Sequence, residues 1–89
     1  MKKYTVEYDP HVMKKISKLD ASVRNRIKKW IDKNLEGCEN PRRVGKALQG
    51  DWDGHWRYRV GDYRIIARIV DDKVIIFVVK IDKRGEVYS

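Results

Sequence analysis

Hydrophobic residues recur along this chain with a period of two near its start and with a helical period directly afterwards. Residues 3–8 alternate between apolar and polar side chains, which predicts a short strand. Asp9 and Pro10 follow in the order expected of a helix cap and a first helical residue. The next apolar positions lie three or four residues apart, at Val12, Met13, Ile16 and Leu19. The pattern therefore predicts a strand that leads at once into an amphipathic helix.

A second amphipathic helix is predicted after Asp20, which can end the first helix and cap the next. Its apolar stripe consists of Val23, Ile27, Trp30, Ile31 and Leu35. Basic residues cover the remaining faces, and Gly37 is suited to end the helix. Two helices joined by so short a connection should pack as an antiparallel hairpin.

The second half of the chain predicts three strands, at residues 55–60, 63–70 and 73–81. The connections Gly61-Asp62 and Asp71-Asp72 are short enough to impose an antiparallel meander. The last strand is apolar on both faces, which favours a position inside the sheet. We expect an α+β fold with an antiparallel sheet, built from the N-terminal strand and the meander, and the helical hairpin packed on one face. Residues 1–89 should form a single domain.

Charge and composition narrow the possible partners. Lys and Arg number 21 against 13 Asp and Glu, so the formal net charge is +8 and favours an anionic partner such as nucleic acid, a membrane surface or an acidic protein. The longest apolar run, residues 74–79, is too short to span a membrane, and no secretory signal is visible. The single cysteine, Cys38, excludes an internal disulfide and favours a cytoplasmic location.

Arginines on one face of the predicted sheet give the strongest chemical signal. Alternation along residues 55–60 directs Arg57 and Arg59 away from the core, and Arg64 on the next strand should lie beside them. Like charges that face each other across strands are destabilising, so such a cluster suggests a bound anion. Guanidinium groups match phosphate because they can bind it in a bidentate fashion. A merely solubilising surface is the alternative interpretation of the cluster.

The remaining chemically interesting residues favour structural roles. His11 and His55 lack the spacing of metal ligands, and no glycine-rich phosphate loop is present, so neither a metal nor a cofactor is expected. His55 is more readily a hydrogen-bonded structural residue than a proton carrier. Trp52 and Trp56 favour packing over stacking on bases, and Cys38 favours an inert small side chain.

Three sequence motifs then occur in a specific order. They are Lys-Ala-Leu-Gln-Gly at residues 46–50, Trp-Arg-Tyr-Arg-Val-Gly-Asp-Tyr-Arg at residues 56–64, and Lys-Arg-Gly-Glu-Val-Tyr at residues 83–88. Together they resemble the RelE/ParE superfamily of bacterial toxins, and its RelE branch in particular. The resemblance implies a RelE-like fold and a type II toxin that cuts mRNA in the ribosomal A site. It also implies a metal-free reaction, in which the ribose 2′-hydroxyl attacks the adjacent phosphate and leaves a 2′,3′-cyclic phosphate.

The same resemblance implies roles for individual residues. Arg59 and Arg64 would stabilise the charge of the transition state, and Arg84 would donate a proton to the leaving 5′-oxygen. Tyr88 would stack on a base or orient the 2′-hydroxyl. Residues expected to bind RNA are Arg57, Lys83, Lys46, Arg42 and Arg43. Arg57 and Arg59 stand where family members often have lysines, and since guanidinium keeps its proton near neutral pH, no ordinary general base is evident.

Expected partners are the ribosome with its mRNA and a cognate acidic antitoxin, which the positive charge should attract as an initially disordered segment. No membrane or metal partner is expected. Two alternatives stay open. One is a ParE-like protein that inhibits DNA gyrase without cutting nucleic acid, and the other is an RNA- or ribosome-binding module without catalytic activity.

Overall fold

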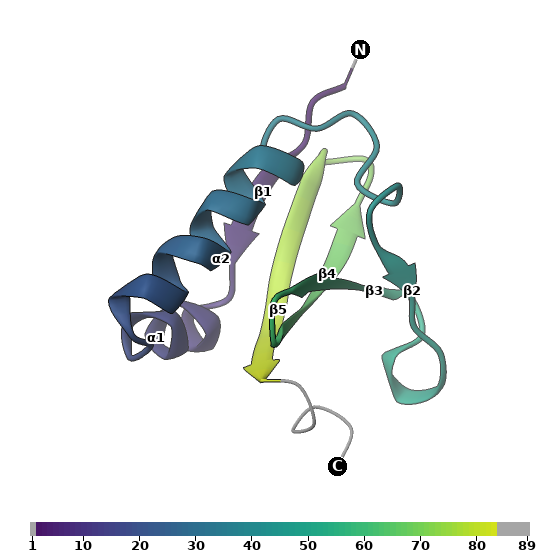
Figure 1. Cartoon of the computed structure of the whole chain (residues 1–89). Coiled ribbons are helices and arrows are strands. Elements are labelled where there is room, and N and C mark those ends of the chain that lie inside the picture. The colour runs from purple at the N-terminus through teal and green to yellow at the C-terminus, as the bar shows by residue number, and fades with distance from the viewer. Residues whose placement is uncertain (1, 84–89) are drawn as a thin grey trace.

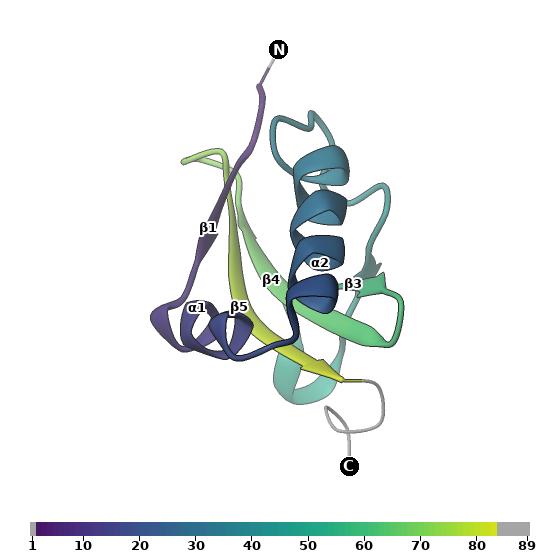
Figure 2. The same cartoon turned by 60° about the vertical axis from the view of Figure 1, so that its left-hand side comes forward.

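The N-terminal part of the chain forms a strand and two helices. A computed structural model describes residues 2–83, with β1 at Thr5–Tyr8, α1 at Pro10–Ser17 and α2 at Ala21–Asn34. The Asp9 carboxylate caps α1 by accepting a hydrogen bond from the His11 backbone N–H at 2.8 Å. After α2, Gly37 has a positive φ of 78°, a conformation that suits glycine and turns the chain away. The predicted strand and both helices are confirmed, but the helices do not form the predicted antiparallel hairpin, because α1 lies across the start of α2 at a steep angle (Figure 2).

A five-stranded sheet makes up the other layer (Figure 1). Its further strands are β2 (Lys46–Ala47), β3 (His55–Val60), β4 (Tyr63–Val70) and β5 (Ile75–Lys83). The order is β1-β5-β4-β3-β2, so β5 lies inside the sheet as its apolar composition predicted. None of the helices within residues 2–83 is long and apolar enough to cross a membrane.

Pairing of β1 differs from the sequence-based expectation. β1 runs parallel to β5, whereas the other neighbours are antiparallel, so the sheet is mixed and not wholly antiparallel. Parallel neighbours require a long connection. Here both helices, β2, β3 and β4 come between β1 and β5 in the sequence. Periodicity in β1 could predict a strand but carries no information on its direction relative to a partner so distant in sequence.

The turn between β4 and β5 is also longer than predicted. Residues 71–74 form it, and β5 begins at Ile75 instead of Lys73. Two overlapping turns shape the segment, since Lys73 N–H bonds to the Val70 carbonyl and Val74 N–H to that of Asp71, both at 3.2 Å. Val74 has a φ of 57°, which is rare for a β-branched residue and explains why alternation alone extended the strand too far.

One face of the sheet packs against the helices and forms the core (Figure 2). Ile27, Ile31 and Leu35, from α2 and the residue after it, have at most 1% exposed surface. They meet the sheet side chains Tyr58, Val60, Ile65, Ala67, Ile76, Val78 and Ile81. Trp30 adds a tilted ring contact to Tyr58, with centroids 5.9 Å apart. The predicted apolar stripe of the second helix therefore covers the predicted inner face of the sheet.

A β-bulge in β5 changes which side chains face this core. Ile66 on β4 pairs with Lys80, but the next residue, Ala67, pairs with Val78, so the register skips Val79. Before the bulge the even-numbered residues Ile76 and Val78 point into the core, and after it the odd-numbered Ile81 does so. Lys80 and Asp82 are thereby directed to the opposite face of the sheet.

The connection from α2 to β2 is fixed against the core by Tyr58. The Tyr58 hydroxyl donates a hydrogen bond to the Pro41 carbonyl at 2.7 Å, and burial raises the pKa of this phenol. Gly45 approaches the same ring so closely that a Cβ there would lie 2.7 Å from Tyr58 Cε1. Close contact at Gly45 and the hydrogen bond at Pro41 together determine where β2 begins.

Substituting Tyr58→Phe should lower the free energy of unfolding by about 1–3 kcal/mol, because the Pro41 carbonyl loses its buried donor. Tyr63→Phe, at a half-buried ring, is the matched control and should change stability by less than about 0.5 kcal/mol. Urea denaturation followed by circular dichroism measures both. Equal stabilities of the two variants would contradict this role of the Tyr58 hydroxyl.

Candidate nucleic-acid interface

Basic side chains line up in rows on the face of the sheet opposite the helices. Directly paired residues of neighbouring strands point to the same face. One row runs from Arg59 on β3 to Arg64 on β4 and Asp82 on β5. The predicted neighbourhood of Arg59 and Arg64 is confirmed, because the two arginines are direct cross-strand partners next to the tight turn at residues 61–62.

A second row crosses four strands. It consists of Lys46 on β2, Arg57 on β3, Ile66 on β4 and Lys80 on β5. Ile66 has no exposed surface although it lies on the face away from the helices. An apolar residue therefore lies in the middle of this row, with cations on both sides of it.

Three of these cations surround a hollow at the β2–β3 side of the face. It has a volume of about 160 Å³ and is lined by Val44, Lys46, Arg57 and Arg59. Two guanidinium groups and one ammonium around a single small hollow make a site suited to a phosphate group. All three cations are among the residues predicted to bind or act on RNA, and β2 is the element that brings Lys46 to the arginines.

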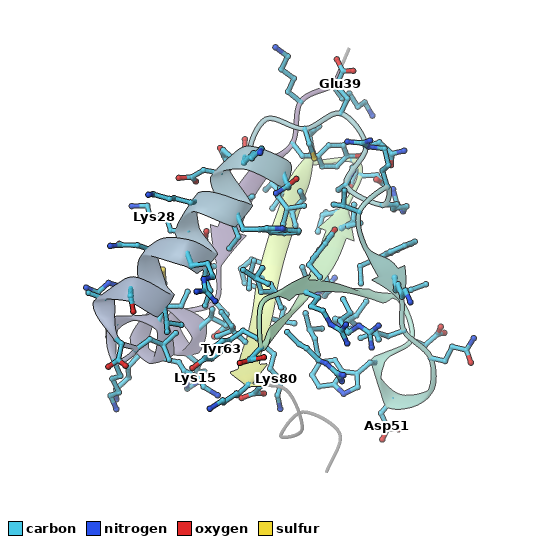
Figure 3. The ribbon with its side chains drawn as sticks, viewed as in Figure 1. Lys15, Lys28, Glu39, Asp51, Tyr63 and Lys80 are labelled. Carbon is cyan, nitrogen blue, oxygen red and sulfur yellow. The ribbon has the colours of Figure 1, made fainter. Side chains whose placement is uncertain are left out.

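Asp82 is the acidic residue of the first row. Its side chain is only 12% exposed, and it forms ion pairs with Lys15 of α1 and with Lys80, the latter at 3.4 Å between Nζ and Oδ2. Figure 3 shows Lys15 and Lys80 close to the end of β5. Desolvation of a carboxylate is offset when it is paired with cations, so this network tolerates a buried acid and joins α1 to the sheet.

Trp52 flanks the second row. It lies in a short 3₁₀ turn, Gly50–Trp52, that connects β2 to β3. Its ring meets His55 edge-on, with centroids 5.3 Å apart, and Lys80 Nζ lies 5.7 Å from its ring centre. The half-buried Trp52 is thus a packed residue, as predicted, but it packs on the cationic face and not in the main core.

Lys80, Asp82 and Trp52 were absent from the residues that the sequence assigned to the site. Lys80 and Asp82 were missed because of the bulge at Val79. Strict alternation from Ile76 and Val78 would place both side chains on the core face. Their polarity at positions where alternation expects apolar residues was the available signal.

Arg42 lies elsewhere, in a cluster with Asp71 and Tyr4. Arg42 donates two hydrogen bonds to the Asp71 carboxylate, at 2.8 and 3.1 Å, and the Tyr4 hydroxyl donates a third at 2.7 Å. The guanidinium also lies 5.7 Å from the Trp56 ring centre. This arrangement joins the connection before β2 to the β4–β5 turn. It gives Arg42 a structural partner at the opposite end of β4 from Arg64, and Arg42 is not among the residues that line the hollow.

The other residues predicted for the site do not line the hollow or lie outside the described part of the chain. Arg43 is exposed on the turn that precedes Val44 and is not among the residues that line the hollow. Lys83 pairs with Tyr63, whose ring packs against the core, so alternation directs Lys83 to the face opposite Asp82. Arg84 and Tyr88, which were predicted to be catalytic, lie outside the described residues.

The titratable groups outside the cationic rows have structural environments. Burial raises the pKa of the Cys38 thiol, which makes it less reactive. His55 Nδ1 is buried and makes no hydrogen bond within residues 2–83, so the expectation of a hydrogen-bonded histidine is not met at this atom. Those residues also bring together no group of three His, Cys, Asp or Glu side chains able to hold a metal ion.

Comparison with known proteins identifies the class to which this fold and this face belong. Residues 6–88 match the family model described as the ParE toxin of the type II toxin–antitoxin system parDE. The mRNA interferase toxin RelE of Escherichia coli K12 is 35% identical over 89 residues, covering 97% of this chain and 90% of the relative. Toxin RelG of Mycobacterium tuberculosis is 27% identical, covering 96% and 95% of the two chains.

Solved structures agree with these relatives. A chain of the RelBE2 toxin–antitoxin complex from M. tuberculosis superposes with a TM-score of 0.82 at 27% identity, covering 92% of this chain and 99% of that one. Isolated RelE toxin from E. coli gives a TM-score of 0.72 at 29% identity, with 96% and 90% covered. An archaeal RelE–RelB complex from Pyrococcus horikoshii gives 0.72 at 28%, with 96% and 99% covered.

The chain is therefore a member of a toxin family of type II toxin–antitoxin systems. It belongs to the RelE/ParE superfamily, and the expected similarity to the RelE branch is confirmed by its RelE relatives.

Substituting Asp71→Asn should destabilise the protein at pH 7 and much less at low pH. Arg42, with Tyr4 as a second donor, holds the pKa of Asp71 at about 2, below the value of about 3.9 for an unfolded chain. Stability from a depressed carboxyl pKa is present above the unfolded pKa and is lost as the pH falls through the folded one. The difference from the parent protein should therefore shrink between about pH 4 and pH 2.

Because the Asp71 side chain is 55% exposed, the difference at pH 7 should not exceed about 1 kcal/mol. Urea denaturation at a series of pH values measures it, with Asp72→Asn in the same turn as the control. A difference from the parent that stays constant down to pH 2 would show that the Arg42 ion pair does not contribute.

Proposed function

We propose that this protein, as a single domain of residues 1–89, is a ribosome-dependent mRNA endoribonuclease that acts as a type II toxin in the cytoplasm. The observation that carries the proposal is the set of cations from β2, β3 and β4 gathered on one open face of the sheet. The mRNA interferase named among its relatives supports the same activity. A single-stranded RNA supplies the phosphates that such a face requires.

The proposed reaction is a transesterification within the RNA. The ribose 2′-oxygen attacks the neighbouring phosphorus, the bond to the 5′-oxygen breaks, and the products carry a 2′,3′-cyclic phosphate and a free 5′-hydroxyl. Negative charge accumulates on the non-bridging oxygens in the transition state, so fixed cations lower its energy. Arg59 and Arg64 have this role, since their side chains start from directly paired positions on one face. Guanidinium groups held by strands also need little reorganisation during the reaction.

Proton transfer is assigned by resemblance to the residues that follow β5. Arg84 is next in sequence to Lys83, the end of β5, and Lys83 pairs with the residue beside Arg64. The proton of the 2′-hydroxyl passes to water, since no general base is evident. Arg84 donates a proton to the leaving 5′-oxygen and regains one from water, and Tyr88 stacks on a base or orients the 2′-hydroxyl. With arginines at positions 57 and 59, catalysis relies chiefly on charge and on the ribosome, which holds the mRNA in line.

A cognate antitoxin is the proposed protein partner. Toxins of this superfamily occur in RelB–RelE complexes in solved structures, including those with the TM-scores given above. The net charge of +8 favours an acidic antitoxin segment that covers the arginine face and blocks access of RNA.

Inhibition of DNA gyrase is the second candidate function, because the matching family model is that of the ParE toxin. The two functions differ in the process that stops first in cells. Pulse labelling after induction separates them, since the proposed activity blocks protein synthesis before DNA synthesis. Mapping of mRNA 5′ ends separates cleavage from mere ribosome binding, because binding without catalysis creates no new ends within codons.

Substituting Arg64→Ala should reduce mRNA cleavage on ribosomes by about 100-fold or more, because a fixed cation of the transition state is lost. Lys28→Ala, which removes an exposed cation from the outward side of α2 (Figure 3), should leave cleavage unchanged. Single-turnover cleavage of mRNA in programmed ribosomes measures both rates. Equal loss in the two variants would assign the effect to overall charge, and no loss in Arg64→Ala would remove this residue from the site.

Substitutions Arg84→Ala and Tyr88→Ala should each relieve growth arrest in cells that express the toxin, because the reaction loses its acid or its base-stacking group. Circular dichroism and thermal unfolding of the purified variants verify that the domain stays folded. Ser89→Ala, at the neighbouring position, is the control and should remain toxic. Variants at residues 84 and 88 that arrest growth as strongly as the parent would refute the proposed catalytic roles.

A further inference from the structure

The β5 side of the cationic face has its own cluster, formed by Lys80, Trp52 and His55. Lys80 reaches this face only because the bulge at Val79 reverses the alternation of β5. Trp52 contacts His55 on β3 and Lys80 on β5, so its ring bridges β4 next to Ile66, which has no exposed surface. None of the three residues belongs to the hollow at the β2–β3 side.

The charge of Lys80 is held in place but not cancelled. Asp82 pairs with Lys80 and also with Lys15, so the three groups together carry one net positive charge. The Lys80 side chain is 40% exposed, whereas that of Asp82 is 12% exposed, so the ammonium is the more accessible of the two. An ammonium anchored by a carboxylate and an indole ring loses less rotamer freedom when it binds an anion.

Spacing across the sheet relates this cluster to the hollow. Arg57 and Lys80 flank Ile66 in one row, so they are separated by two strand spacings, or roughly 10 Å. Between them lies an apolar floor with an aromatic ring at its side. Proteins hold single-stranded nucleic acid with cations placed along its phosphate backbone and with aromatic rings on which its bases stack.

We propose that Lys80 and Trp52 form a second RNA subsite, which binds the phosphate and the base of a nucleotide adjacent to the one held by Lys46, Arg57 and Arg59. The mRNA strand then crosses the sheet perpendicular to its strands, from β2 towards β5. This subsite rests on the proposed function, because it extends the same RNA-binding face. Lys80 contacts the substrate away from the scissile bond, so it contributes binding rather than chemistry.

Binding of a short single-stranded mRNA oligonucleotide at several salt concentrations tests the subsite. In Lys80→Met, the slope of log affinity against log salt should fall by about 0.7, the value for one phosphate contact. Lys80→Arg keeps the charge and should keep the slope. Lys73→Met, at an exposed lysine in the β4–β5 turn, is the control for lost charge and should also keep it. On programmed ribosomes, Lys80→Met should raise the half-saturating toxin concentration and leave the maximal cleavage rate within about twofold.

Tryptophan fluorescence gives an independent measurement. Trp30 and Trp56 pack against the core, whereas Trp52 lies on the RNA-binding face. RNA should therefore change the emission of the parent protein and have much less effect on Trp52→Phe. An RNA-induced change of emission in Trp52→Phe as large as that in the parent protein would refute the stacking role of Trp52.

Several outcomes would overturn the subsite. These are an unaltered salt slope in Lys80→Met, equal slopes in Lys80→Met and Lys73→Met, or failure of the parent protein to bind the oligonucleotide at low salt. If Lys80→Met weakened binding only to ribosomes that carry no mRNA, the lysine would be assigned to a contact with ribosomal RNA instead. Loss of ribosomal cleavage in Arg64→Ala, together with an unchanged half-saturating toxin concentration in Lys80→Met, would leave the proposed function intact and remove only the second subsite.

Discussion

A single extra residue in β5, an interior strand, governs how this small sheet presents its two faces. Val79 is skipped by the register between β4 and β5, and the side chains after it change sides. Without that change, Ile81 would leave the core and Lys80 would enter it, at the cost of burying an ammonium among apolar side chains. The bulge lets one strand contribute Ile76, Val78 and Ile81 to the core and still supply charged groups to the opposite face.

The cationic face depends on several elements that are each fixed by a separate contact. β3 and β4 bring Arg59 and Arg64 together through a tight turn, as local sequence indicates. β2 adds Lys46 because the preceding connection is fixed by the Tyr58 hydrogen bond to Pro41 and by the contact at Gly45. The Arg42–Asp71 pair holds the same connection to the distant β4–β5 turn. The position of Lys46 on the basic face thus depends on contacts that are made outside that face.

Sequence reasoning succeeded where the information is local and failed where it depends on distant pairing. Periodicity predicted both helices, β1, β3, β4 and the inner and outer faces of the β3–β4 hairpin, because alternation and capping act within a few residues. It could not give the parallel direction of β1, since that follows from a partner near the other end of the chain. It also missed the bulge, and with it Lys80 and Asp82. The ion pair of Arg42 was missed for a related reason, because its partner Asp71 lies in a turn far along the sequence.

The pairing of β1 with β5 has a consequence for synthesis of the protein. Thr5 finds its neighbour only in Ile75, and β5 lies between β1 and β4. Such non-local contacts form late, after the cost in chain entropy of closing a long loop has been met. β1 and the two helices must therefore wait for β5 before the layer beneath them is complete. A chain still growing on its ribosome lacks β5 until residues 75–83 have been made, so the finished basic surface cannot arise before then.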